Sequence, residues 1–146
     1  MSTIAERTRA LLEEIARLEA RHGRAPGSVT LLGISKTHDA ARVREAHAAG
    51  LSQFGESYVQ EALPKIEALA DLPLTWHFVG RIQGNKTAAI AGGFAWVHGI
   101  DRLRIARRLD EQRPAHLPPL DCCIEVNLSG EASKGGATPQ ELPALA

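Results

Sequence analysis

Two kinds of apolar spacing alternate along the chain. Residues 2–22 carry apolar side chains at helical spacing, among them Leu11, Leu12 and Ile15, while Glu and Arg fill the other face. This spacing predicts an amphipathic helix. Residues 29–35 then form a short and nearly continuous apolar run, which is typical of a strand buried on both faces in a parallel sheet.

The alternation continues to the end of the chain. Strands are expected at 52–55, 74–79, 94–98 and 121–127, and helices at 39–49, 57–70, 85–91, 101–112 and from about residue 138. Asp39 and Asp101 are the expected caps of two of these helices. Strands that alternate with helices indicate right-handed βαβ units and an α/β fold with a parallel sheet.

Two architectures fit this order, the open doubly wound sheet and the (β/α)₈ barrel. The glycine fingerprint of dinucleotide-binding folds is absent after the first strand, and so is the phosphate-loop pattern. This weakens a nucleotide-binding interpretation but leaves an open sheet possible.

Composition narrows the functional classes. The 146 residues contain 17 basic and 17 acidic side chains, and this balance argues against a general nucleic-acid binder. No apolar run has the length of a membrane span, so no membrane association is expected. The only cysteines, Cys122 and Cys123, are adjacent and badly placed to pair, which favours a cytoplasmic location. His22, His47 and His116 lack metal-ligand spacing, and no metal site is expected.

Lysine is scarce, because the 17 basic residues are 13 Arg and four Lys. Lys36 directly follows the first predicted strand, where ligands of parallel α/β folds bind. A lysine at the rim of an apolar core can lose hydration and act as an amine nucleophile, whereas arginine stays protonated. On position alone, a lysine that extends into solvent remains the alternative. Lys65 lies in mid-helix and is expected to be solvated.

Three consecutive motifs, at residues 34–37, 54–61 and 76–86, carry a family resemblance, and residues 100–102 and 125–136 extend it. The chain resembles the pyridoxal phosphate homeostasis proteins, which share the barrel of the alanine racemase N-terminal domain. The resemblance implies a (β/α)₈ TIM-type barrel that binds pyridoxal 5′-phosphate (PLP), held as an aldimine on the amine of Lys36.

Three further cofactor contacts are candidates through the same resemblance. Ser57 stands where the family usually has Asn and can still donate a hydrogen bond, with a shorter reach. His77 is out of phase with its aromatic neighbours, so it faces the barrel interior near the cofactor or is a hydrogen-bonded core histidine. Asn127 ends the fifth strand and either reaches the cofactor or caps a loop. Glu56 is interpreted as a helix-start acid, and Glu61 as part of a solvated face.

Residues 1–146 supply about five of the eight βα units that the resemblance implies, since such barrels typically have about 250 residues. The chain is therefore expected to be a barrel incomplete at its C-terminus, with the phosphate-binding residues beyond Ala146. The expected full-length protein is a monomer.

The expected role is to hold PLP and deliver it to PLP-dependent apo-enzymes. A PLP-dependent amino-acid racemase is the alternative in another class, and it needs a second group that moves a substrate proton. Tyr58 is the only tyrosine and is expected to pack within a helix, so a carrier is favoured over a catalyst. A non-binding fragment is the third possibility.

Overall fold

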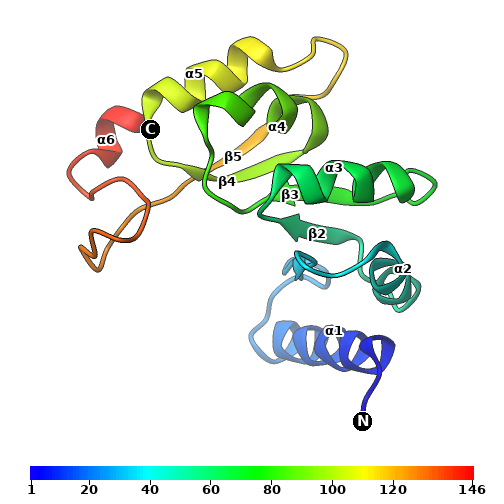
Figure 1. The fold of residues 1–146 in the computed structure, drawn as a ribbon. Coiled ribbons are helices and arrows are strands. Elements are labelled where there is room, and N and C mark those ends of the chain that lie inside the picture. Colours follow the sequence, from blue (N-terminus) through cyan, green and yellow to red (C-terminus); the bar gives the residue numbers. More distant parts are fainter.

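Five parallel strands form one sheet in the order in which they occur along the chain. The computed structural model describes residues 1–146, and each strand pairs only with its neighbours in sequence (Figure 1). The strands are β1 (Gly33–Ile34), β2 (Gln53–Glu56), β3 (Thr75–Phe78), β4 (Trp96–Ile100) and β5 (Asp121–Ile124).

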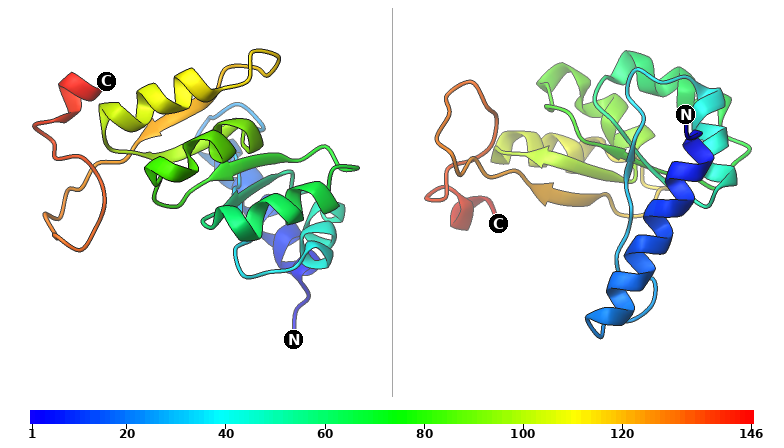
Figure 2. Two further views of the ribbon diagram at one scale, coloured as in Figure 1. Left: turned by 45° about the horizontal axis from the view of Figure 1, so that its top comes forward. Right: turned by 90° about the horizontal axis from the view of Figure 1, so that it is seen from below.

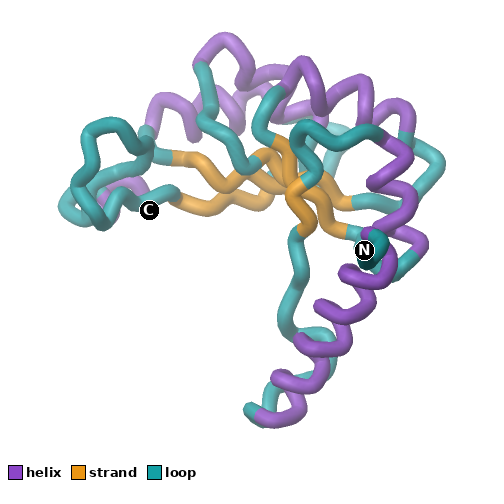
Figure 3. The backbone as a smooth tube through the Cα atoms, turned by 60° about the horizontal axis from the view of Figure 1, so that its bottom comes forward, coloured by secondary structure: helices purple, strands orange, loops and turns teal.

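Helices connect these strands and also precede and follow them. They are α1 (Ile4–Arg21), α2 (Ala40–Ala48), α3 (Val59–Ala68), the 3₁₀ turn η1 (Gly84–Lys86), α4 (Thr87–Gly93), α5 (Leu103–Gln112) and α6 (Leu142–Leu145). Helices α2 to α5 form an arc along one side of the strands (Figure 3). The C-terminal end of α1 reaches well beyond the sheet (Figure 2, right). None of the helices is long and apolar enough to cross a membrane.

The hydrophobic core lies between the sheet and this arc of helices. Phe54, Phe78 and Val97 point from the strands into the core, where Ile90 and Leu109 meet them from α4 and α5. An uninterrupted strand order with helices on one face is the arrangement of a (β/α)₈ barrel wall. A doubly wound sheet has helices on both faces and a reversal of strand order. The partial-barrel prediction is confirmed, and the open-sheet alternative is excluded.

A side-chain cap in the local sequence explains the start of two helices, α1 with Thr3 and α2 with Asp39. Asp39 accepts a hydrogen bond from the Arg42 N–H at 3.0 Å and caps α2, as predicted. The predicted cap of α5 by Asp101 is wrong, because α5 begins after Arg102 without a side-chain cap. Asp101 instead accepts a bond from the Gly136 N–H at 3.3 Å, so it anchors the loop that follows β5.

The first strand is shorter than predicted. Its only neighbour in the sheet is β2, and only Gly33 and Ile34 pair with it. Val29, at the start of the apolar run, instead gives its N–H to the Glu19 carboxylate at 2.8 Å. The apolar run therefore holds the chain against the end of α1 before it enters the sheet.

Candidate functional site

The carboxyl ends of the strands lie at one edge of the sheet because all five strands are parallel. Lys36 follows β1 at this edge and is exposed, and it makes no hydrogen bond through its side chain. Ser57 and Tyr58 follow β2 at the same edge. The edge therefore presents a primary amine at the end of one strand and hydroxyl groups at the end of the next.

The backbone on both sides of Lys36 is fixed to its surroundings. Before it, buried Ser35 donates its N–H to the Gly55 carbonyl at 3.0 Å, which extends the ladder to β2. After it, Thr37 adopts a left-handed backbone conformation with φ of 66°, and its N–H donates a hydrogen bond to the carboxylate of Glu61. A threonine in this region is strained. The bond to Glu61 helps to hold the turn that carries Lys36.

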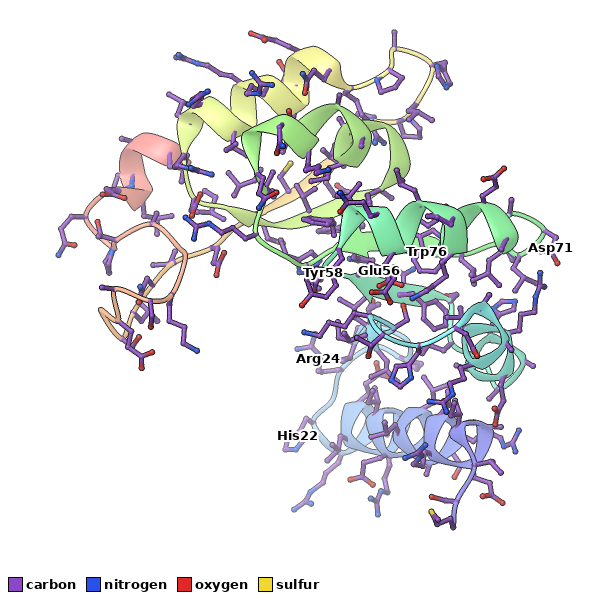
Figure 4. The ribbon with its side chains drawn as sticks, in the orientation of Figure 1. His22, Arg24, Glu56, Tyr58, Asp71 and Trp76 are labelled. Carbon is purple, nitrogen blue, oxygen red and sulfur yellow. The ribbon has the colours of Figure 1, made fainter.

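A buried ionic network lies beneath this turn. Lys65 on α3 donates from Nζ to the Ser35 carbonyl at 2.9 Å and to Glu61 Oε1 at 3.1 Å, and it forms a close ion pair with Glu56. The Lys65 and Glu56 side chains are only 6% and 0% exposed. Glu56 lies beneath α3, whose N-terminal end is marked by Tyr58 and whose other end leads to Asp71 (Figure 4).

This network corrects three predictions from the sequence. Lys65 is buried rather than solvated, Glu56 is fully buried, and Glu61 is partly buried and bonded to Thr37 and Lys65. The spacing of Val59, Ala62 and Lys65 is the signal that was missed, because it places the lysine on the buried face of α3.

Charge and hydrogen bonding also act on Glu61. The Thr37 N–H and, after it, the Lys65 ammonium hold the pKa of the Glu61 carboxyl below its usual range, and partial burial opposes them. Glu61 is therefore an anion at neutral pH and a steady acceptor for Thr37.

His77 lies on the sheet face opposite the helices, as its phase in β3 predicts. Its Nε2 donates to Gln53 Oε1 at 2.7 Å, and its Nδ1 accepts from His98 Nε2 at 2.9 Å. The ring stacks on Trp96 with centroids 5.4 Å apart. Burial, followed by the nearby charge of His98, lowers the pKa of His77 to about 4, and Asp121 opposes this shift. Burial lowers the pKa of His98 as well. His77 is thus a neutral, hydrogen-bonded histidine at neutral pH, with both ring nitrogens occupied.

Asn127 organises the loop after β5. Its Oδ1 accepts from the Gly130 N–H at 3.0 Å and from Ser129 Oγ at 3.2 Å, and its Nδ2 donates to the Glu131 carbonyl at 3.0 Å. Asn127 therefore caps the loop, and both its amide oxygen and its amide nitrogen are hydrogen-bonded within the loop.

A cavity of about 380 Å³ opens beside the ends of β2 and β3. Ser57 lines it, together with Tyr58, Arg81 and Lys86. Tyr58 is 56% exposed and immediately precedes α3, so the prediction that it packs within a helix is wrong. The Ser57 hydroxyl makes no hydrogen bond within the chain and is free to meet a ligand.

No group of three or more potential ligands for a metal ion occurs anywhere in the chain.

Fold and site together define a protein with part of a parallel (β/α)₈ barrel and an exposed lysine at the end of its first strand. Residues 7–146 match the family model described as alanine racemase, N-terminal domain, and the chain belongs to that family.

Curated relatives extend the match to the whole chain. It is 61% identical over 146 residues to the pyridoxal phosphate homeostasis protein of Pseudomonas aeruginosa and 47% identical over 149 residues to that of Escherichia coli K12. Each match covers 100% of this chain and 64% of the relative, so the chain spans about 64% of the length of these relatives. The resemblance found in the motifs is confirmed.

Solved structures agree with the fold. PipY of Synechococcus elongatus PCC7942 with PLP bound superposes with a TM-score of 0.72 at 40% identity, over 88% of this chain and 62% of PipY. PipY without PLP gives a TM-score of 0.74 at 41% identity, over the same shares of the two chains. Alanine racemase of Corynebacterium glutamicum shares the fold at 19% identity, with a TM-score of 0.65 over 97% of this chain and 38% of the racemase.

Proposed function

We propose that this chain binds PLP through the amine of Lys36 and serves the intracellular homeostasis of PLP. One observation carries the proposal: Lys36 is an exposed primary amine at the carboxyl end of the first barrel strand, with its backbone fixed on both sides. When bound, PLP supplies an aldehyde that links reversibly to a primary amine and a ring that withdraws electrons.

The residues at this edge suit such a cofactor. Among side chains only lysine has a primary amine for this link, and Lys36 has its amine free, while the amine of Lys65 is fully hydrogen-bonded. Ser57 offers a free hydroxyl at the neighbouring strand end. His77 and Asn127 use their polar atoms within the chain, so in this proposal they shape the sheet face and the loop instead of donating to the cofactor.

A carrier role needs a reversible link and no group that moves a substrate proton. It agrees with the names of the relatives that cover the whole chain and with the PLP bound to PipY. The proposal extends to delivery of PLP to apo-enzymes in the cytoplasm. Two free cysteines, one of them exposed, suit a reducing compartment.

Absorbance titration of the chain with PLP tests the proposal. Wild type should give the spectrum of an amine-bound cofactor, and Lys36→Ala and Lys36→Arg should not. Lys134→Arg is the matched control, because it changes another exposed lysine outside the cavity that Ser57 lines and should bind like wild type. Equal spectra for wild type and Lys36→Ala would disprove the assignment. Racemisation of L-alanine at the rate of a true racemase would overturn the carrier role.

A further inference from the structure

Resting on the proposed function, we propose that Glu61 and Lys65 are positioning residues for Lys36. They fix the backbone on both sides of the reactive amine, and the same contacts make Lys65 unreactive toward aldehydes. Neither residue needs to touch the cofactor.

The contacts of Glu61 and Lys65 end on the two residues that flank Lys36. Lys65 Nζ bonds the carbonyl of Ser35, the residue before Lys36, at 2.9 Å. Glu61 bonds the N–H of Thr37, the residue after it. Glu61 and Lys65 are bonded to each other at 3.1 Å, one turn apart on α3. The two flanks of Lys36 are therefore fixed to one rigid helix.

The turn that carries Lys36 needs support from outside the turn. Thr37 has φ of 66°, a conformation that L-residues with a side chain rarely adopt. The next residue, His38, returns its N–H to the Ser35 carbonyl at 3.0 Å, which closes the turn around Lys36. Without the Glu61 bond, Thr37 could relax to an ordinary conformation and carry the Lys36 amine away from its place.

The same hydrogen bonds set the reactivity of Lys65. An ammonium group has three N–H donors. Lys65 has three acceptors, Ser35 O, Glu56 Oε1 and Glu61 Oε1. With all three N–H groups bonded and the side chain buried, the Lys65 nitrogen has no open side from which an aldehyde can approach it. Selectivity for Lys36 over Lys65 follows from the network.

Amide hydrogen exchange on the cofactor-free chain tests the positioning directly. In Glu61→Ala the Thr37 amide should exchange at least about tenfold faster than in wild type, because its acceptor is lost. The Ala62 amide, bonded to the Tyr58 carbonyl at 2.9 Å, should be unchanged and reports that α3 is intact. Glu67→Ala is the matched control on the exposed side of the same helix. Equal Thr37 exchange in wild type and Glu61→Ala would overturn the positioning role.

PLP titration gives a second readout. Glu61→Ala should bind about fivefold more weakly or worse with unchanged far-UV circular dichroism, and Glu61→Gln, which keeps an acceptor oxygen, should recover part of the loss. If wild type and Glu67→Ala bind at Lys36 and Glu61→Ala binds equally well, only the positioning role fails. If wild type does not bind at all, the proposed function fails instead.

Peptide mapping after borohydride reduction tests the inertness of Lys65. Under an excess of PLP that labels exposed Lys134, Lys65 should remain unlabelled in the folded chain. Labelling of Lys65 to the same extent as Lys134 would overturn this part of the inference.

Discussion

Removing the Lys65 ammonium should destabilise the chain more than any change at its surface. Lys65→Met keeps an unbranched side chain of similar length but leaves Glu56, which is 0% exposed, without its cation. One bond to Glu56 survives, from Ser35 Oγ at 3.2 Å, and Oε2 of this carboxylate already has no partner. The variant therefore contains a buried charge that is almost uncompensated.

The expected cost is about 3–5 kcal/mol, the range found when one partner of a buried ion pair is removed. Domains of this kind have a total stability of about 5–15 kcal/mol, so the loss is a large part of the whole. Lys134→Met, at an exposed position of the loop after β5, should change stability by no more than about 0.5 kcal/mol.

Urea denaturation followed by circular dichroism measures these differences, provided that the slope against denaturant stays the same. The double variant Lys65→Met/Glu56→Leu separates charge from packing. Replacement of both partners by apolar side chains is often close to neutral, so the double variant should be more stable than Lys65→Met alone. A cost below about 1 kcal/mol for Lys65→Met, or a double variant as unstable as the sum of both single changes, would refute the reasoning.

Three further measurements test other parts of the structure. At Thr37, with φ of 66°, Thr37→Gly should be more stable than Thr37→Ala by about 0.5–1 kcal/mol in urea denaturation. Glu19 accepts the N–H groups of Val29 and Gly27, which lower its pKa, so Glu19→Gln should lower the urea midpoint near neutral pH and match wild type again as the pH falls through the lowered pKa. The pKa of His77 is lowered to about 4, so the unfolded chain binds more protons between about pH 6.5 and 4, and stability falls as the pH falls through that range. His77→Gln should flatten this part of the melting-temperature profile, although His98 contributes in the same direction.

Each of these has a clear contrary result. Thr37→Ala equal to or more stable than Thr37→Gly would mean that the left-handed turn is not kept in solution. A constant difference between Glu19→Gln and wild type at every pH would show that the Glu19 charge is not involved. An unchanged slope between pH 6.5 and 4 in His77→Gln would assign the titration to other groups.

The elements of the fold could be predicted because their causes are local. The apolar period of α1 and the Asp39 cap of α2 depend only on residues close together in the sequence, and the structure confirms both. The side of β3 that carries His77 also follows from a period of two, with Trp76 and Phe78 directed to the core. The partner of His77 could not be predicted, because His98 comes from another strand.

The ionic network was missed because its causes are distant in sequence. A lysine is assigned to solvent by its chemistry, and a nearby acid such as Glu61, four residues away, is also common on an exposed helix face. The partners that make burial of Lys65 favourable are Glu56 and the Ser35 carbonyl, nine and thirty residues away. Asn127 shows the opposite case, in which the deciding partners lie within four residues and a loop role was already one of two alternatives.

The network changes in exposure from one end to the other, and this separates its contributions to folding and to the site. Glu56 is completely buried under α3, whereas the Glu61 side chain is 32% exposed and reaches the turn that carries Lys36. Since the penalty for an unpaired charge grows with burial, changes at Lys65 and Glu56 act mainly on folding. Water can replace part of what Glu61 provides to Lys65, but it cannot hold Thr37 in its left-handed conformation. Glu61 is therefore the member of the network whose removal should alter the position of Lys36 while leaving most of the fold intact.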